Sequence, residues 1–540
     1  MEKWWQDRVV YQIYPRSFAD TDGDGMGDIP GILSHLDDLK DLGVGILWLS
    51  PVYPSPDADN GYDISDYRGI DPKYGTMEDM EKMIREAAAR DIRIVMDLVI
   101  NHTSDEHEWF QQSRDRMSPY RDYYIWRTGN GGKPPNNWTG FFGEGCWEYD
   151  DKSGEYYMHL FAKKQPDLNY HNPRVIEEIK DIMRFWLDKG VGGFRCDVIN
   201  VIYKSSLADG KKRLALTGSE HYISQEGAHE ILRAFRRDVL SAYDCFAVGE
   251  TVFVTPKMGR DLCDKSRGEL DMIFSFEHME TDQIFVKWFK RRFSPVRFGR
   301  VIAKWQQELE WNANYLENHD QPRSVSRFGD DGEFWAQSAK MLCVMLFTLR
   351  GTPFIYQGQE IGMTNFDFAG MDQIQDVESH NIYRLAKKLL IPAPIRWRMI
   401  KKTSRDNART PMQWNGGKNA GFTAGTPWLG INRNYTRINM AGQKDDPDSV
   451  LGFYKKMIAL RAGSELIKYG AFRLVRASGK LFVYEREKEG KCCRVLLNFG
   501  SRPAKSPCAG SVLVSSSGRT RYDGRLLPWE AVVIEKGEEQ

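Results

Sequence analysis

Acidic side chains and histidines recur in this sequence directly after short apolar segments, where folding could gather them in one place. Each one alone could be a solvated or helix-capping residue, but together they would supply several titratable groups to one site. Glycoside hydrolysis needs such a set, with one carboxylate as nucleophile and a second, protonated one that donates to the leaving oxygen. The candidate residues are Asp97, His102, Asp197, Glu250, His319 and Asp320.

The elements that must position these residues are eight apolar or β-branched segments in the first two-thirds of the chain. Helix-like segments, such as 80–89 and 175–189, lie between them. Apolar strands that alternate with helices indicate a parallel sheet, and eight such units indicate a closed (β/α)8 TIM barrel with its active site at the C-terminal strand ends. The predicted strands are 9–14, 45–49, 92–97, 193–197, 245–250, 271–276, 315–320 and 353–357.

The predicted barrel is interrupted by a long insertion and followed by a second domain. Residues 1–102 and 169–465 form the catalytic barrel in this interpretation, and 103–168, rich in Gly, Asn, Trp and Tyr, form an inserted domain after strand 3. From 466 to 540 the pattern changes to alternating strands joined by a Lys-Glu-Gly turn, which predicts a C-terminal antiparallel β-sandwich domain.

Two features are predicted between the eighth strand and the C-terminal domain. A second polar insertion runs from about residue 365 to 433. A helix follows over 450–461, capped by Ser449 and ended near Gly463.

Composition narrows the class of ligand. The 540 residues include 75 Lys plus Arg and 75 Asp plus Glu, so there is no net charge to favour nucleic acid or an anionic membrane. We therefore expect a small, neutral oligosaccharide as the partner, no nucleic acid or membrane, and a monomer. Eight cysteines without C-x-x-C spacing indicate free thiols, and the N-terminus has no apolar signal segment, so we expect the cytoplasm.

Five motifs in order give the chain a resemblance to a known family. Over its whole length it resembles the α-amylase family of glycoside hydrolases, family 13, in the branch of oligo-1,6-glucosidases, dextran glucosidases, α-glucosidases and trehalose-phosphate hydrolases. The motifs are DLVINH at 97–102, QPDLN at 165–169, GFRCDVIN at 193–200, VGET at 248–251 and ENHDQPR at 317–323.

The resemblance implies roles for the residues of these motifs. Asp197 corresponds to the nucleophile, Glu250 to the general acid/base and Asp320 to the third carboxylate, which grips sugar hydroxyls. Because Arg195 lies two residues before Asp197 on a strand, both side chains face the same way, and the guanidinium can keep the carboxylate ionised. His102, His319 and Arg323 are expected at the substrate, and Asp97 is expected to hold Arg195.

Specificity is implied by residues outside the five motifs. Asp59 and Tyr62 match residues that close the sugar pocket, and Arg409 matches an arginine that pairs with this aspartate over the 4-hydroxyl of the terminal sugar. Such a clamp admits only a non-reducing end. An ordinary salt bridge between loops is the alternative interpretation.

The linkage preference rests on fewer residues. Val198 resembles members acting on α-1,6 bonds, and Glu378 and Lys287 resemble residues of the +1 site in dextran glucosidases. Gln359 replaces a glutamate that is more usual in these hydrolases. The Arg-Leu-Asp-Arg-Asp motif of the related sucrose isomerases is absent.

A loop near the N-terminus alternates acidic residues with glycine, as the first part of a calcium loop does. Gly31 stands at the twelfth position, so this is no EF-hand. The resemblance implies a structural Ca²⁺, with Mg²⁺ as an alternative and no organic cofactor; a plain Asp/Gly turn is the other interpretation. The implied ligands are Asp20, Asp22, Asp24, Asp28 and the carbonyl of Met26.

We therefore predict an exo-acting retaining α-glucosidase that releases glucose from short α-glucosides and prefers α-1,6 linkages. The alternatives are a trehalose-6-phosphate hydrolase, a sucrose-acting enzyme or a general α-1,4-glucosidase. A metal-dependent hydrolase using His102 and His319 is disfavoured because no H-E-x-x-H motif is present. A non-enzymatic sugar-binding subunit is disfavoured because all three catalytic carboxylates are present. A basic run over 287–292 is interpreted as a solvated helix face.

Overall fold

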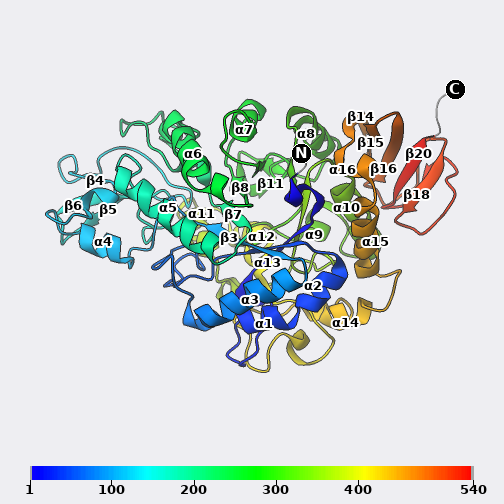
Figure 1. The fold of residues 1–540 in the computed structure, drawn as a ribbon, viewed down its shortest axis with the longest axis horizontal. Helices are drawn as coiled ribbons and strands as arrows, with labels where there is room; N and C mark the ends of the chain where they lie inside the picture. The colour runs from blue at the N-terminus through cyan, green and yellow to red at the C-terminus, as the bar shows by residue number, and fades with distance from the viewer. Residues whose placement is uncertain (1–2, 537–540) are drawn as a thin grey trace.

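Eight parallel strands form the centre of the molecule in a computed structural model that describes residues 3–536 (Figure 1). Their order is β12-β13-β1-β2-β3-β7-β8-β9, and the edge strands β9 and β12 are in contact, which closes the ring. The (β/α)8 barrel predicted from the sequence is therefore confirmed. The strands are β1 (Val10–Ile13), β2 (Ile46–Leu49), β3 (Arg93–Leu98), β7 (Gly193–Cys196), β8 (Phe246–Glu250), β9 (Met272–Phe274), β12 (Ala313–Asn314) and β13 (Thr352–Tyr356).

The seventh barrel strand differs from the prediction. Strand β12 pairs with β13 only through Ala313 and Asn314, so the predicted segment 315–320 follows the strand instead of forming it. The Tyr315 side chain turns into the packed core, where its ring lies 5.2 Å from that of Phe274. The motif that begins at Glu317 therefore lies in the loop beyond the strand.

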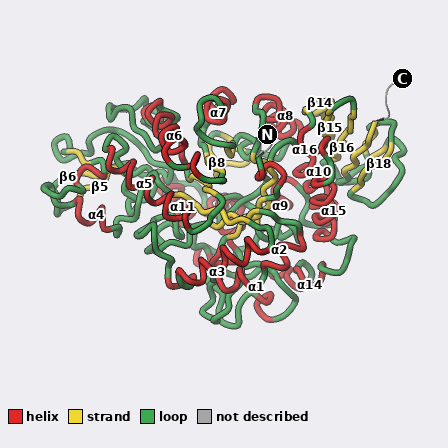
Figure 2. The backbone as a smooth tube through the Cα atoms, in the orientation of Figure 1, coloured by secondary structure: helices red, strands yellow, loops and turns green. Residues whose placement is uncertain are grey.

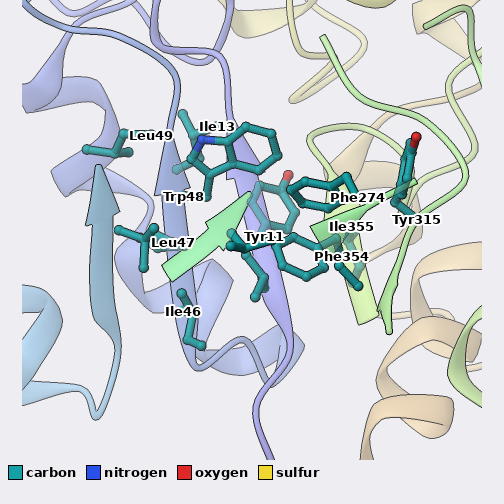
Figure 3. Packing of buried hydrophobic residues seen from close by; sticks show 14 of the residues in the cluster. Tyr11, Ile13, Ile46, Leu47, Trp48, Leu49, Phe274, Tyr315, Phe354 and Ile355 are labelled. Atoms are coloured by element: carbon teal, nitrogen blue, oxygen red, sulfur yellow. The ribbon is translucent and has the colours of Figure 1, made fainter. Parts of the chain in front are cut away.

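Large aromatic side chains pack together in the barrel interior (Figure 3). The Phe274 ring lies 5.7 Å from Trp48 and 4.7 Å from Phe354. The Trp48 indole also donates a hydrogen bond of 3.2 Å to Asp97 Oδ2. Since protein interiors are close-packed, this aromatic layer gives the polar groups above it a rigid support.

Helices surround the strands (Figure 2). Helix α15 begins after Ser449, whose Oγ accepts from Gly452 N at 2.9 Å, and it ends at Gly463, as predicted. The longer helices of the barrel are α3 (Met77–Ala89), α5 (Pro173–Asp188), α6 (Glu226–Asp238), α7 (Pro256–Cys263), α8 (Pro295–Glu308), α10 (Trp335–Thr348) and α15 (Val450–Ala462).

Two insertions extend from the barrel. Between β3 and β7, helix α4 (Glu108–Ser113) accompanies a three-stranded sheet at one end of the molecule (Figure 1). The sheet consists of β4 (Trp126–Arg127), β5 (Trp147–Asp150) and β6 (Glu155–Met158). The second insertion contains helices α11 (Val377–Lys388) and α12 (Ala393–Thr403), where the sequence indicated only a polar segment.

Antiparallel strands form the C-terminal part at the opposite end of the molecule (Figure 1). A five-stranded sheet, in the order β14-β15-β16-β20-β18, packs an apolar face toward the two-stranded sheet β17-β19. The strands are β14 (Ala471–Ser478), β15 (Leu481–Lys488), β16 (Lys491–Asn498), β17 (Ala504–Lys505), β18 (Ser511–Ser515), β19 (Arg525–Leu526) and β20 (Ala531–Lys536). All eight cysteines are free, and within residues 3–536 no helix combines the length and apolar character that crossing a membrane requires.

Candidate active site

One guanidinium joins three carboxylates at the C-terminal end of the barrel. Arg195 on β7 donates to Asp97 Oδ1 at 2.8 Å and to Asp197 Oδ1 at 2.6 Å through Nη1, and to Glu250 through Nη2. The Arg195 side chain is 1% exposed, so these interactions lie away from bulk water. A single positive charge cannot balance three negative ones, and the cluster favours retaining a proton.

The protonation states of two carboxyl groups diverge. Burial raises the pKa of Glu250 well above its usual range; Arg195 opposes the rise, and the nearby Asp197 and Asp320 charges add to it. Burial also disfavours the charged form of Asp320, but His319 and then Arg405 outweigh it and hold the pKa of Asp320 well below its usual range. The site thus contains Glu250, which favours its protonated form, together with Asp320, which stays ionised.

A histidine and an amide form one wall of the site. His102 Nε2 lies 3.0 Å from the Tyr62 carbonyl oxygen and 3.0 Å from Gln165 Nε2. Burial lowers the pKa of His102, so the imidazole stays neutral. Gln165 also reaches Asp59 Oδ2 at 3.5 Å. Gln165 belongs to the QPDLN motif but was not predicted as a site residue.

The predicted pairing of Asp59 with Arg409 is wrong. Arg405 makes this contact instead, with Nη2 2.8 Å from Asp59 Oδ1, and Asp376 holds Arg405 from the other side at 2.7 Å. Arg409 lies 2.7 Å from Asp320 Oδ1. Arg405, just before the short helix α13 (Asp406–Arg409), also lies 3.4 Å from Asp320 Oδ1, so both arginines reach Asp320 and, of the two, only Arg405 reaches Asp59.

A cavity of about 990 Å³ opens above these groups. Of the predicted catalytic and substrate-binding residues, eight line it: Asp59, Tyr62, His102, Asp197, Val198, Glu250, Asp320 and Glu378. Arg195, His319 and Arg409 lie behind that lining and contact its carboxylates.

The structure contradicts the predicted role of Arg323 in substrate binding. Its side chain is fully buried outside the cavity lining, where it donates to Glu317 Oε1 at 3.1 Å and to the Gln357 and Ala408 carbonyls at 2.6 and 3.0 Å. The motif spacing suggested a site residue, but Arg323 connects the loop after β12 to the loop that carries Arg409.

The residues implied in linkage specificity, Val198, Glu378 and Lys287, all line the cavity. Val198 has φ of 36°, a left-handed conformation that is rare for a β-branched residue and costs free energy. Glu378, on α11, forms an ion pair with Lys287 on β11 (Val286–Lys290). Both Glu378 and Lys287 line the cavity.

Acidic side chains converge in the N-terminal loop, away from the cavity. Single carboxylate oxygens of Asp20, Asp22 and Asp28 lie within 4.8 Å of one another, whereas Asp24 is outside this group. In the described residues none of these four carboxylates pairs with Lys or Arg. Oxygen-only donors with uncompensated negative charge fit a hard divalent cation.

A buried carboxyl group that favours its protonated form and two further carboxyl groups on the same guanidinium, at the strand ends of a (β/α)8 barrel, form the kind of site that defines glycoside hydrolases. The α-amylase catalytic-domain model matches residues 12–470. The chain belongs to the α-amylase family.

Proteins of this family are similar to the chain over nearly its whole length. The sequence is 49% identical to the oligo-1,6-glucosidase of Parageobacillus thermoglucosidasius over 98% of both chains. Among solved structures, the trehalose-6-phosphate hydrolase of Bacillus licheniformis superposes with a TM-score of 0.93 at 41% identity, covering 99% of this chain and 100% of the other. The isomaltulose synthase of Klebsiella sp. LX3 has a TM-score of 0.96 at 40% identity, covering 99% of each chain.

Proposed function

We propose that the protein is an exo-acting retaining α-glucosidase with a preference for α-1,6 linkages. The observation that carries the proposal is the shared contact of Arg195 with Asp197 and Glu250. Asp197 attacks the anomeric carbon while Glu250 gives its proton to the departing oxygen. Glu250, now ionised, then takes a proton from the water that releases glucose from Asp197.

The exo action is supported by the Asp59–Arg405 pair. Both side chains line the cavity and are at least nine-tenths buried, and Gln165 and Asp376 fix them from either side. A rigid charged pair can bind the hydroxyls of a terminal sugar and leave no path for a longer chain.

The α-1,6 preference is supported by Val198 beside the nucleophile and by the oligo-1,6-glucosidase relative. A branched side chain there crowds a sugar joined directly at a secondary hydroxyl, while the extra methylene of an α-1,6 bond lets that sugar swing clear. The test is the kcat/KM of the purified protein for isomaltose, maltose, sucrose and trehalose 6-phosphate. Isomaltose should have the highest kcat/KM. A higher kcat/KM for any of the other three substrates contradicts the α-1,6 preference.

Trehalose-6-phosphate hydrolysis is the second candidate, because a solved structure so named is similar over the full chain. A phosphate dianion needs free cationic donors. The cations among the described cavity residues are Arg213, Lys287 and Arg405. Since Lys287 pairs with Glu378, Arg405 with Asp59 and Arg213 with Glu220, the cavity favours a neutral sugar.

We further propose that Asp20, Asp22 and Asp28 bind a structural Ca²⁺, or Mg²⁺ in its place. Metal analysis of protein purified without chelator should find about one equivalent, and EDTA should lower the melting temperature. An Asp22→Asn variant with unchanged metal content and melting temperature would exclude this site. The free cysteines support a reducing, cytoplasmic location. A monomer remains our expectation, to be checked by light scattering.

A further inference from the structure

A buried lysine lies behind the part of the cavity wall that His102 forms. Lys204, in the loop that follows β7, is 3% exposed, and its Nζ lies 2.6 Å from Asp167 Oδ2 and 2.9 Å from Asn101 Oδ1. Nζ also donates to the Ile202 carbonyl at 3.3 Å. An ammonium group has three N–H bonds and no acceptor, so these three oxygens occupy all of its hydrogens.

Lys204 fixes the direction in which the Asn101 amide points. Because lysine can only donate, the amide atom 2.9 Å from its Nζ must be the oxygen and not the nitrogen. The amide nitrogen of Asn101 therefore faces His102, with Nδ2 3.2 Å from the imidazole Nδ1. Turning the amide over would place its N–H bonds against the ammonium group. Since Asn101 and Lys204 are both buried, that arrangement would leave donors without partners, which costs free energy.

The Asn101 amide in turn decides which ring nitrogen of His102 carries the hydrogen. Nδ1 of His102 faces a donor, so it must accept and carry no hydrogen. Nε2 lies 3.0 Å from the Tyr62 carbonyl oxygen, which can accept a hydrogen from it. Burial lowers the pKa of His102, so the ring does not take up a second proton. The single hydrogen therefore resides at Nε2.

The ring nitrogen with the hydrogen is the one on the side of the substrate. Tyr62 and Gln165, which surround Nε2 of His102, both line the cavity, whereas Asn101 at Nδ1 lies outside its lining. An N–H group at Nε2 can donate to a hydroxyl oxygen of a bound sugar. With the hydrogen at Nδ1, Nε2 would present a lone pair next to the Tyr62 carbonyl oxygen, and the two would repel each other.

We propose that Lys204 is a positioning residue that sets the tautomer of His102 through Asn101, so that an N–H group faces the sugar. The proposal deepens the α-glucosidase function proposed above, and its kinetic part rests on that function. Its structural part concerns the location of one hydrogen atom and can be measured without substrate.

Nitrogen NMR of protein that is isotope-labelled in histidine alone measures the tautomer directly. A ring nitrogen that carries hydrogen and one that does not resonate far apart, so each tautomer has its own signature. The chain has ten histidines, and the signals of His102 are those lost in a His102→Gln variant. In the wild type we expect hydrogen at Nε2 and none at Nδ1. Hydrogen at Nδ1 in the wild type would overturn the proposal.

Lys204→Met should reverse the tautomer. Without the ammonium group, the Asn101 amide is free to turn its oxygen toward His102, and the charge of Asp167 favours the amide nitrogen in the place of the oxygen. The hydrogen should then move to Nδ1. The kcat/KM for isomaltose should fall at least about fivefold, as for one lost hydrogen bond.

Asn101→Asp gives a second test if Lys204→Met does not fold. The aspartate keeps the shape of the side chain and accepts from Lys204, but it replaces the donor opposite Nδ1 of His102 with an acceptor. We expect Nδ1 to carry a hydrogen in this variant. An unprotonated Nδ1 would show that residue 101 does not control the ring and would overturn the proposal.

Lys180→Met is the matched control for the loss of a buried lysine. Lys180 on α5 is also buried and is paired with two carboxylates, those of Glu177 and Asp238. Its replacement should leave both the tautomer of His102 and the kcat/KM for isomaltose as in the wild type.

The remaining outcomes separate this proposal from the function it rests on. A folded Lys204→Met variant that keeps hydrogen at Nε2 of His102 overturns the role of Lys204. A reversed tautomer with an unchanged kcat/KM overturns the role of the N–H group at the sugar. A wild-type protein without activity on isomaltose contradicts the proposed α-glucosidase, while the NMR signals still decide the tautomer.

Discussion

At the scale of single residues, the proposed mechanism depends on the contacts that one arginine makes with three carboxyl groups. Arg195 contacts Asp97, Asp197 and Glu250, and it is almost completely buried. Burial makes charge on a second neighbouring carboxylate expensive, which is why the pKa of Glu250 rises. The same surroundings therefore favour a protonated Glu250 beside Asp197.

Glu250→Gln should lower kcat/KM on isomaltose by about 10²–10⁴-fold, because the departing sugar no longer receives a proton. An aryl glucoside with an acidic leaving group needs little protonation, so its cleavage should be less affected. The wild-type kcat/KM should also fall as pH rises through the raised pKa of Glu250, since the acid must be protonated, and this alkaline limb should be missing in the variant. Equal losses on both substrates, with the limb retained, would assign the acid elsewhere.

The two arginines after α12 should have separable effects. Arg405→Ala removes the partner of Asp59 and should raise KM on isomaltose and lower kcat, because the terminal ring is positioned less well in both ground and transition states. Arg409→Lys keeps a positive charge near Asp320 and should raise KM less. Steady-state kinetics of both variants check this order, and a larger KM effect for Arg409→Lys would favour the pairing expected from the sequence.

Val198→Ala should move the linkage preference. Removing two methyl groups beside Asp197 opens room for a sugar linked at a secondary hydroxyl, and methyl-scale changes in a pocket alter discrimination by about 10–200-fold. The ratio of kcat/KM for maltose to that for isomaltose should rise within this range. An unchanged ratio would mean that other residues select the linkage.

At the scale of elements, most of what positions the site could be predicted from the sequence, because it depends on local patterns. Seven of the eight barrel strands overlap their predicted segments, and α15 begins at its predicted cap. The seventh strand was placed too late because the apolar Tyr315 and Leu316 follow a strand of only two residues. The local pattern does not distinguish residues buried in a loop from residues buried in a strand.

The partners of the arginine side chains could not be predicted from the sequence. Arg405 and Arg409 share one polar segment, and only tertiary packing decides which of them reaches Asp59. Arg323 follows Asp320 by three residues in the same motif but turns into the protein. Likewise, Phe285, which is 92% exposed and lines the cavity, lies at the turn of a two-stranded hairpin with no strong pattern of its own.

The junction between barrel and C-terminal sheet gives a prediction at this scale. Arg486 on β15 is fully buried and donates to the carbonyls of Thr348, Ile467 and Gly470. Within residues 3–536 it forms no ion pair with a carboxylate. It therefore satisfies the C-terminal end of α10. Arg486→Met should destabilise the protein by about 2–4 kcal/mol, because buried carbonyls lose their donors.

The measurement is the thermal unfolding midpoint of the variant. Arg476→Met, on the exposed edge strand β14, is the control and should leave the midpoint nearly unchanged. A midpoint for Arg486→Met equal to that of the control would show that the carbonyls find other donors and that Arg486 does not hold the junction.

At the scale of the whole molecule, the cavity is assembled from parts that are distant in sequence. Asp197 and Glu250 come from the barrel, His102 directly precedes the first insertion, Gln165 lies near its end, and Glu378 comes from the second. The C-terminal sheet lies at the far end of the molecule and packs on the barrel (Figure 1). In the proposed function, the insertions thus define which sugar enters, while the barrel supplies the chemistry.

The most direct test of the proposed retaining mechanism is proton NMR of isomaltitol hydrolysis. Isomaltitol carries one α-1,6-linked glucose on an alditol, so every glucose signal comes from the newly cleaved sugar. Two displacements, first by Asp197 and then by water, predict that the α-anomer appears first and that the β-anomer grows only at the rate of spontaneous mutarotation. Initial appearance of β-glucose would contradict the assignment of Asp197 as nucleophile and of Glu250 as its acid/base partner.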